Sequence, residues 1–206
     1  MIDVGKNTLG VRLLRGTLLL MMRILFRIEH AGMERIPKSG PLLIVANHVT
    51  YFDPFWIALR IQRTMRIMAW DKIFSFPLAG RLFCWFGAFP VSLENPETGA
   101  FKMALRVLRN GEALMMFPEG GRSVDGRLRP FKEGASRLAV RTGAAVLPVA
   151  VKGGEKVWSP KMRLPRPGKV RVEYLQPIFK EEFGADVAAL TDLIRQRIQA
   201  HLTAPS

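Results

Sequence analysis

The sequence predicts an α/β fold: a single domain with a mixed, largely parallel sheet flanked by helices, preceded by an amphipathic N-terminal helix. Short apolar runs alternate with helical patterns from Pro41 onward, which is typical of strand–helix–strand units. The 206 residues are enough to bury one core but too few for two fused enzymes. Hydrophobic residues make up 49% of the chain and charged residues 23%, proportions that exclude an intrinsically disordered protein.

The predicted strands are short apolar runs bounded by polar residues, proline or glycine. In chain order they lie at 42–46, 66–69, 113–117, 146–151 and 170–174. The first run contains no polar residue, so we expect it to be buried. The last run follows a stretch, 153–168, that is dense in Pro, Lys, Arg and Gly. We expect that stretch to be a surface loop and the strand after it to be an edge strand.

The predicted helices begin and end at recognisable signals. They lie at 54–61, 73–86, 96–110, 132–142 and 186–201. Asp53 and Pro54 suit the N-cap and the first turn of the first of these helices. Gly111 and Gly143 follow two of the others, as expected for residues that end a helix.

The segment 9–28 is apolar but is interrupted by Arg12, Arg15, Arg23 and Arg27. These arginines are too frequent for a membrane span or a signal peptide. On a helix at about 100° per residue they fall within a stripe of about 120°, and apolar side chains occupy most of the rest. The pattern predicts an interfacial helix on an anionic membrane. Packing of the same helix on the domain's own core is the alternative.

The charge balance indicates an anionic partner. Thirty-one basic and 17 acidic residues give a formal net charge of +14, and the isoelectric point is about 10.9. A mean hydropathy of +0.11 favours an anionic phospholipid membrane over nucleic acid, for which we find no binding motif. We therefore expect residues 1–32 to bind the cytoplasmic face of a membrane peripherally and 33–206 to form the main domain.

Cysteine usage limits the chemistry. Cys84 is the single cysteine, so an intramolecular disulfide and a cysteine-built zinc site are excluded. This composition fits a reducing compartment.

A histidine and an aspartate follow the predicted strand 42–46 and precede the next helix. Ligands bind at such strand ends in α/β sheets. Histidine is the side chain best suited to take a proton near neutral pH, so His48 is a candidate base, and Asp53 is placed to accept a hydrogen bond from one of its ring nitrogens. The alternative is structural: Asp53 caps the helix and His48 is a buried histidine. The two roles of Asp53 are compatible because a carboxylate has two oxygens.

A second polar stretch follows the predicted strand 113–117. Gly120 and Gly121 allow backbone amides to converge on an anion, and Arg122 adds a planar guanidinium that matches phosphate. Lys132 extends this basic surface. Arg127 and Arg129 also lie nearby, but a solvated charge run accounts for them better.

Four sequence blocks occur in a fixed order. They are Asn47-His48 with Asp53, Phe117-Pro118-Glu119-Gly120-Gly121-Arg122-Ser123, Phe131-Lys132-Glu133-Gly134-Ala135 and Val146-Leu147-Pro148-Val149. Together they resemble the ordered motifs of the glycerolipid acyltransferase family, over roughly residues 41–151. One block could arise by chance, but four in order are specific.

The resemblance implies transfer of a fatty acyl group from acyl-CoA or acyl-carrier protein to the free hydroxyl of lysophosphatidic acid, without a metal, a cofactor or a covalent acyl-enzyme. His48 would be the general base and Asp53 the residue that orients it. Lys72, between the first two blocks, would stabilise the oxyanion. The substrate-binding residues would be Asn47, Glu119, Gly120, Gly121, Arg122 and Lys132.

One position departs from the family pattern. The family's second block ends in an arginine that holds the acceptor phosphate, whereas the run 87–93 ends here in Leu93. Either Arg122 and Lys132 hold the phosphate alone, or the acceptor is a different lysolipid. A noncatalytic membrane-docking protein and a nucleic-acid-binding protein are the remaining alternatives. The intact histidine–aspartate pair disfavours the first, and the lack of a binding motif disfavours the second.

Aromatic residues gather just before that run. They could line an apolar acyl channel, although aromatic residues at this spacing are more often plain core. The residues are Phe74, Phe76, Phe83, Trp85 and Phe86.

Overall fold

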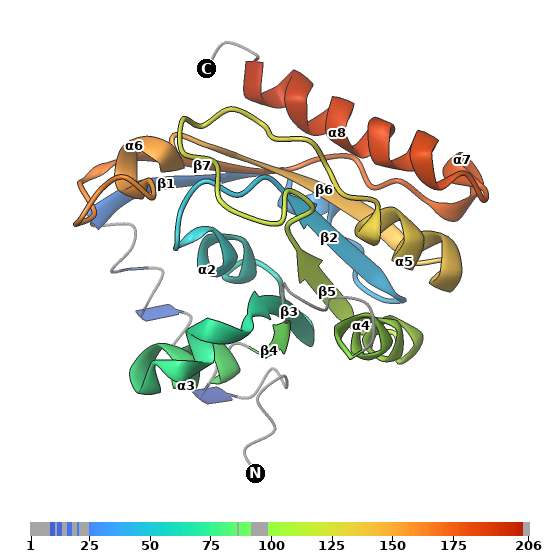
Figure 1. Ribbon diagram of the computed structural model, residues 1–206, viewed down its shortest axis with the longest axis horizontal. Helices are drawn as coiled ribbons and strands as arrows, with labels where there is room; N and C mark the ends of the chain where they lie inside the picture. Colours follow the sequence, from blue (N-terminus) through green and yellow to red (C-terminus); the bar gives the residue numbers. More distant parts are fainter. Residues whose placement is uncertain are drawn as a thin grey trace.

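The computed structural model describes residues 9–10, 12–13, 16–17, 20, 25–85, 87–91 and 99–203. Its strands are β1 (Phe26–Ala31), β2 (Leu42–Ala46), β3 (Met65–Trp70), β4 (Ala88–Val91), β5 (Ala113–Met116), β6 (Ala145–Lys152) and β7 (Gly168–Tyr174). They form one sheet in the order β1-β7-β6-β2-β5-β3-β4 (Figure 1). Neighbouring strands are parallel except β6 and β7. The prediction of a mixed, largely parallel sheet is confirmed.

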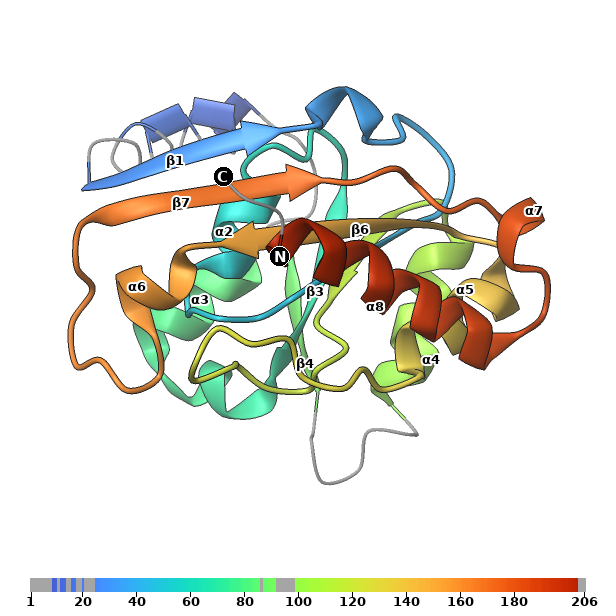
Figure 2. The same ribbon diagram turned by 90° about the horizontal axis from the view of Figure 1, so that it is seen from above.

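Helices cover both faces of the sheet. They are α2 (Asp53–Ala58), α3 (Pro77–Trp85), α4 (Ala100–Arg109), α5 (Gly134–Thr142), α6 (Gly154–Trp158), α7 (Lys180–Phe183) and α8 (Val187–Thr203), with 3₁₀ turns η1 (Met33–Arg35) and η2 (Asp71–Ser75). α4, α5 and α8 pack on one face, and α2, α3 and α6 contribute to the core of the other (Figures 1 and 2). The result is a three-layer α/β arrangement.

Strand β2 lies in the middle of this arrangement. Leu42 and the alternate residues after it belong to the hydrophobic cluster that includes α2, whereas Leu43 and Val45 belong to the cluster with α4, α5 and α8. Fully burying each leucine or isoleucine stabilises the fold by roughly 1.5–3 kcal/mol. Because both faces are covered, the strand is apolar throughout, as predicted. The first polar residue after it, Asn47, is held at the carboxyl end of the sheet.

The prediction that 170–174 is an edge strand is wrong. β7 lies inside the sheet because β1 covers its outer side, with Phe26 paired to Gly168 in a parallel register. The sequence gives little sign of this, because β1 and β7 are separated by most of the chain.

The end of the predicted amphipathic helix is also wrong. Residues 26–28 belong to β1, in which Phe26 and Ile28 are buried and the residues between and after them, Arg27 and Glu29, are exposed. This period of two buries one side of a strand, and pairing with β7 satisfies its backbone.

The rest of the predicted N-terminal helix lies mostly outside the described residues. Those that the structure describes between residues 9 and 25 have helical backbone, and the Thr17 hydroxyl donates to the carbonyl of Leu13, four residues earlier. The interfacial helix and the boundary at residue 32 therefore stay predictions. Within the described ranges, every helix is too short or too polar to cross a membrane.

Three further elements differ from the predictions. The predicted helix 73–86 is divided into η2 and α3. The edge strand β4 is an addition, and its Pro90 is tolerated because an edge strand has one unpaired side. The predicted loop 153–168 begins with the short helix α6.

Two helices begin two or more residues later than predicted. α5 begins at Gly134 rather than at residue 132, because the Lys132 backbone N–H donates to the carbonyl of Pro118 (2.9 Å) and keeps this segment in the loop after β5. α4 begins at Ala100 rather than at residue 96. Residues 92–98 lie outside the described ranges.

Candidate active site

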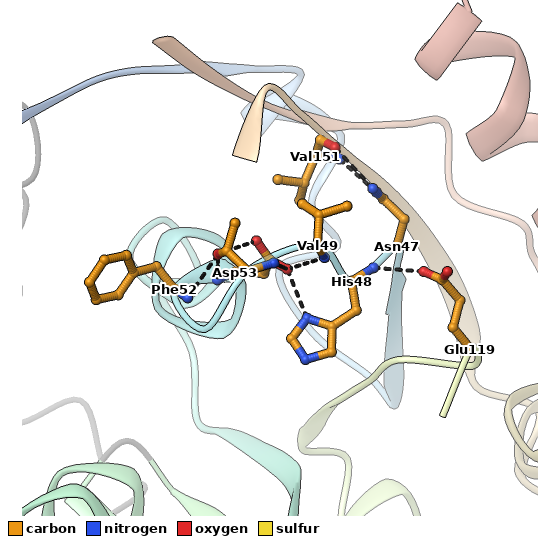
Figure 3. A network of polar contacts seen from close by, with 8 residues as sticks. Asn47, His48, Val49, Phe52, Asp53, Glu119 and Val151 are labelled. Carbon is orange, nitrogen blue, oxygen red and sulfur yellow. Dashed lines mark hydrogen bonds and ion pairs between the residues drawn. The ribbon is translucent and has the colours of Figure 1, made fainter. Parts of the chain in front are cut away.

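Two loops meet at the carboxyl end of the central strands. Residues 47–53 follow β2 and lead into α2, and residues 117–133 follow β5 and lead into α5. β2 and β5 are parallel neighbours, so both loops leave the sheet at the same edge. Figure 3 shows His48 between Asp53, on its own loop, and Glu119, on the second loop.

The Asp53 carboxylate is fully buried and fixes the whole 47–53 loop. Its Oδ2 atom accepts hydrogen bonds from His48 Nδ1 (2.7 Å) and from the backbone N–H groups of Val49 (2.6 Å) and Thr50 (2.8 Å). Its Oδ1 atom accepts the Thr50 hydroxyl (2.7 Å), which in turn accepts the backbone N–H groups of Phe52 and Asp53. The loop therefore wraps around one carboxylate.

This geometry corrects the predicted N-cap. α2 begins at Asp53 itself, Phe52 occupies the N-cap position, and no side chain caps the helix there. The carboxylate turns back to the amides before it instead of forward to the helix. One oxygen, Oδ2, both binds those amides and orients His48.

His48 is held in one tautomer. A carboxylate oxygen only accepts hydrogen bonds, so Nδ1 carries a proton, and in the neutral ring Nε2 bears the lone pair. In Figure 3 the second ring nitrogen points away from Asp53. The ring stacks on Phe117, with 4.0 Å between centroids and 19° between planes, and 18% of the side chain remains exposed. The site therefore contains an oriented imidazole that is partly exposed.

The backbone of His48 is bound by the second loop. Its N–H donates to Glu119 Oε1 (2.7 Å), and its carbonyl accepts the N–H of Ser123 (2.7 Å). Glu119 Oε2 accepts the N–H of Arg129 (2.9 Å). Burial raises the pKa of Glu119, although these backbone donors and the nearby positive charges oppose the rise. Glu119 thus links the backbone at His48 to the backbone at Arg129, and both of its carboxylate oxygens accept hydrogen bonds.

Asn47 is likewise engaged within the protein. Its side-chain amide donates to the carbonyl of Val151 (2.9 Å), and its oxygen accepts the N–H of the same residue (2.7 Å), so it continues the pairing of β2 with β6 (Figure 3). The structure gives Asn47 a positioning role. That it also contacts substrate stays a prediction.

The cationic side of the site is formed by the second loop. The Arg122 guanidinium lies over the Tyr51 ring, 3.5 Å from its centroid. Its buried Nη1 atom has no hydrogen-bond partner among the described residues. A buried arginine nitrogen without a partner is uncommon in proteins, and a planar guanidinium matches phosphate oxygens.

The two glycines of the loop make room for two further cations. Gly120 has a positive φ of 69°, and a Cβ atom there would lie 3.0 Å from both Cε and Nζ of Lys132. A Cβ atom on Gly121 would lie 3.1 Å from Arg129 Nη1. Arg127 and Arg129 are both exposed, as a solvated charge run predicts, and the Arg129 guanidinium also lies against Gly121 of the loop.

The remaining predicted residues are less closely tied to the site. Lys72 is exposed in η2, at the carboxyl end of β3, and its ammonium lies over the Trp70 ring at 5.1 Å. Its role near the reacting carbonyl stays a prediction. Leu93 lies outside the described residues. Of the aromatic cluster, Phe83 packs on Phe55 in the core and Phe76 is 66% exposed, so the acyl channel also stays a prediction.

Three participants were missed from the sequence. Phe117, Ser123 and Tyr51 lie in or beside the quoted motif blocks, but spacing along the chain does not show that they contact His48 or Arg122. The part of the chain that the structure describes contains no group of three or more His, Cys, Asp or Glu side chains that could hold a metal ion.

Fold and site together define an α/β domain that presents a carboxylate-oriented histidine beside a cationic glycine loop. Residues 27–152 match the model of the Acyltransferase family, which is more than half of the chain. The protein belongs to the Acyltransferase family.

Similar proteins support the same assignment. The chain is 29% identical to the chloroplastic 1-acyl-sn-glycerol-3-phosphate acyltransferase BAT2 of Brassica napus, over 84% of this chain and 50% of the relative. It is 28% identical to 1-acyl-sn-glycerol-3-phosphate acyltransferase alpha of Mus musculus, over 93% of this chain and 69% of the relative. The chain thus spans about half the length of BAT2.

A solved structure has the same fold. The crystal structure of the 1-acyl-sn-glycerophosphate acyltransferase PlsC from Thermotoga maritima superposes with a TM-score of 0.75, covering 93% of this chain and 83% of that one. The sequence identity is 24%, so this likeness shows the fold alone.

Proposed function

We propose that the protein transfers a fatty acyl group from a thioester donor to the free hydroxyl of lysophosphatidic acid, giving phosphatidic acid for phospholipid synthesis. The observation that carries the proposal is the His48–Asp53 pair, which lies beside a cationic loop in a chain of the Acyltransferase family. The names of the relatives support this acceptor.

The histidine acts as a general base. Nε2 of His48 takes the proton from the acceptor hydroxyl as its oxygen attacks the thioester carbonyl. The tetrahedral intermediate then collapses, the C–S bond breaks, and the proton passes from the imidazolium to the leaving thiolate. Asp53 stabilises the imidazolium without taking its proton. Because a thioester is already activated, a base that contributes about 10²- to 10⁴-fold and an oxyanion donor suffice. The reaction written in this way requires no metal or other cofactor.

The cationic loop binds the acceptor. The phosphate of lysophosphatidic acid lies against Arg122 and Lys132, with Arg129 as a third cation. Because Gly120 and Gly121 have no side chains, the phosphate can approach the backbone of the loop closely. Glu119 and Asn47 hold the loops in place. Lys72 stabilises the oxyanion from the end of β3.

The enzyme works at an anionic membrane. Both lipids reside in the bilayer, and the net charge of +14 and the arginine stripe of residues 9–28 suit peripheral binding at the cytoplasmic face. The donor is acyl-CoA or acyl-carrier protein, and nucleic acid is not a partner.

A second candidate differs in the acceptor. Leu93 stands where the family has a phosphate-binding arginine, so a lysolipid whose headgroup needs one cation fewer is the alternative acceptor. The catalytic residues are the same for both.

A panel of acceptors tests both candidates. The full-length protein is mixed with one labelled acyl donor, first acyl-CoA and then acyl-carrier protein, and with each of several lysolipids, and labelled product and free thiol are measured. We expect product with lysophosphatidic acid, and a loss of about 10²- to 10⁴-fold in kcat for His48→Ala. His201→Ala, in the last turn of α8, is the matched control and should keep full activity. Unchanged turnover in His48→Ala would remove the base from the mechanism.

A further inference from the structure

A second basic surface lies next to the site and takes no part in the mechanism above. We call residues 156–169 the basic loop; it runs from α6 to the start of β7. It contains five basic residues and no acidic residue: Lys156, Lys161, Arg163, Arg166 and Lys169. All five are exposed.

An apolar side chain stands among these charges. Leu164 is 76% exposed, more than any other large hydrophobic residue in the described part of the chain. Its neighbours Arg163 and Arg166 are exposed as well. An exposed leucine between two exposed arginines in the sequence favours the boundary between headgroups and acyl chains, where both kinds of side chain find a partner.

Hydrogen bonds and prolines fix the backbone of the basic loop. The Met162 N–H donates to the carbonyl of Ser159 (2.9 Å), the Trp158 indole donates to the carbonyl of Met162 (3.2 Å), and the Arg166 N–H donates to the carbonyl of Val157 (2.8 Å). Three prolines in 159–168 restrict the backbone further. The exposed leucine is therefore presented by a shaped turn.

The cations of the loop are largely unneutralised. Lys169 pairs with Glu29 (3.0 Å). For Lys156, Lys161, Arg163 and Arg166, no carboxylate of a described residue lies within ion-pair distance. Four positive charges are thus free to meet an anionic surface.

The basic loop packs against the 47–53 loop. The Trp158 ring lies 4.8 Å from the rings of both Tyr51 and Phe52. A Cβ atom on Gly154 would lie within 3.0 Å of side-chain atoms of Val49 and Thr50. A membrane surface that binds the basic loop is therefore close to the 47–53 loop.

The loop also lies where the N-terminal segment enters the sheet. Gly168, at its end, pairs with Phe26, the first residue of β1. In Figures 1 and 2, α6 and the start of β1 lie at the same end of the molecule. A membrane bound by residues before β1 would meet the basic loop as well.

We infer that the basic loop is a second lipid-docking surface, in which Leu164 enters an anionic leaflet and Lys161, Arg163 and Arg166 contact its phosphates. The inference rests on the proposed function, because a lipid acceptor has to reach His48 from the bilayer. An apolar tip favours lipid over an acidic protein or nucleic acid, whose surfaces offer no acyl layer.

Vesicle binding by the full-length protein tests the inference. Partition into vesicles of phosphatidylglycerol and phosphatidylcholine is compared with partition into phosphatidylcholine alone. The triple variant Lys161→Gln, Arg163→Gln, Arg166→Gln should bind the anionic vesicles about 100-fold more weakly, since each basic residue contributes about fivefold. Equal loss of charge on α4, by Lys102→Gln, Arg106→Gln and Arg109→Gln, should leave binding within about threefold of wild type.

A second measurement tests whether the side chain at position 164 enters the bilayer. Leu164→Trp should show fluorescence quenching by brominated lipids in anionic vesicles beyond that of the wild-type tryptophans. Leu164→Ser should weaken binding without changing the melting temperature. Equal binding by the two triple variants, or no added quenching at position 164, would overturn the inference. The inference would also be overturned if the Lys161, Arg163 and Arg166 triple variant lost binding to acyl-carrier protein but kept its binding to vesicles, because this result would assign the loop to a protein partner.

Activity separates this inference from the proposed function. On a short-chain, water-soluble lysophosphatidic acid the loop variants should keep wild-type kcat, while turnover on vesicles falls with binding. If neither the wild-type protein nor the loop variants acylate any acceptor, the proposed function fails. The vesicle-binding result still decides the role of the loop.

Discussion

The two halves of the candidate site are built in opposite ways. In the 47–53 loop, the Asp53 carboxylate binds one side chain, one hydroxyl and two backbone amides within five residues of itself. In the second loop, the Arg122 guanidinium stacks on the Tyr51 ring of the first loop. One of its buried nitrogens has no hydrogen-bond partner among the described residues. The 47–53 loop, which is the proposed catalytic half, is thus held by hydrogen bonds within the protein, whereas the second loop, which is the proposed binding half, contains an arginine nitrogen without a partner among the described residues.

The comparison has a physical basis. A base needs one fixed tautomer and one fixed direction, and a buried carboxylate with several donors supplies both. A phosphate site needs positive charge that is not already neutralised by the protein. Glu119 connects the two loops without neutralising this charge. Its carboxylate binds backbone N–H groups of both loops, and no ion pair with the Arg122 guanidinium is found among the described residues.

Asp53→Asn should have the largest effect on the catalytic half. An asparagine keeps one acceptor oxygen, but its NH₂ group would face the Thr50 hydroxyl, which already accepts two N–H groups. The imidazolium would also lose its counter-charge. We expect kcat to fall about 10²- to 10⁴-fold and the free energy of unfolding to fall by about 1–3 kcal/mol, measured by steady-state kinetics and urea unfolding.

The control for this variant is Asp192→Asn, on the exposed side of α8. It should leave both quantities unchanged. Wild-type kcat in Asp53→Asn would show that orientation of the histidine is not what the catalytic half supplies.

Arg122→Ala should break the binding half alone. A charge-assisted hydrogen bond contributes about 1.5–3 kcal/mol, so the KM for the lysolipid acceptor should rise about 10- to 100-fold. The KM for the acyl donor should change much less, and kcat only slightly. A larger rise in the donor KM would move Arg122 to the donor side of the site.

Tyr51 should sharpen the same comparison with a smaller effect. Tyr51→Leu removes the ring under the guanidinium, and a cation–π contact of about 0.5–1 kcal/mol corresponds to a rise of about two- to fivefold in the acceptor KM. Tyr51→Phe keeps the ring and should retain the wild-type KM. If Phe and Leu behave alike, the ring does not position Arg122.

Glu119 should give the smallest effect, visible as a pH dependence of stability. Burial raises its pKa in the folded protein, so the folded state holds the proton more tightly than the unfolded chain does. Its contribution is then most favourable below the unfolded pKa of about 4.3 and is lost as the pH rises through the folded pKa. Glu119→Gln removes this titration, so the stability difference, wild type minus variant, should decrease between pH 4 and pH 7.

A residue with the opposite shift controls this experiment. The Phe179 backbone N–H and Arg197 lower the pKa of Glu182, so its contribution is lost as the pH falls through the folded pKa. Urea unfolding of Glu182→Gln should therefore show a weaker dependence of opposite sign. The same sign for both variants would contradict the assigned burial of Glu119.

The sequence predicted the elements that carry their own signal. The wholly apolar run 42–46 predicted a buried strand, and Gly143 ends α5 with a positive φ of 67°, as expected of a C-terminal glycine. The His48–Asp53 hydrogen bond was predicted from their spacing and motif, and the structure contains it. Each of these depends on a few neighbouring residues.

Contacts between distant segments were decided only by the tertiary structure. Parallel pairing of β1 with β7 made β1 the edge strand and moved Phe26–Ile28 out of the predicted helix. The sheet also brought Glu119 to the His48 backbone, 71 residues away in sequence, and Tyr51 to Arg122. Local sequence determines backbone preference and the pattern of burial, because these depend on near neighbours. Which distant side chains meet depends on strand order and register, which the packing of the whole chain decides.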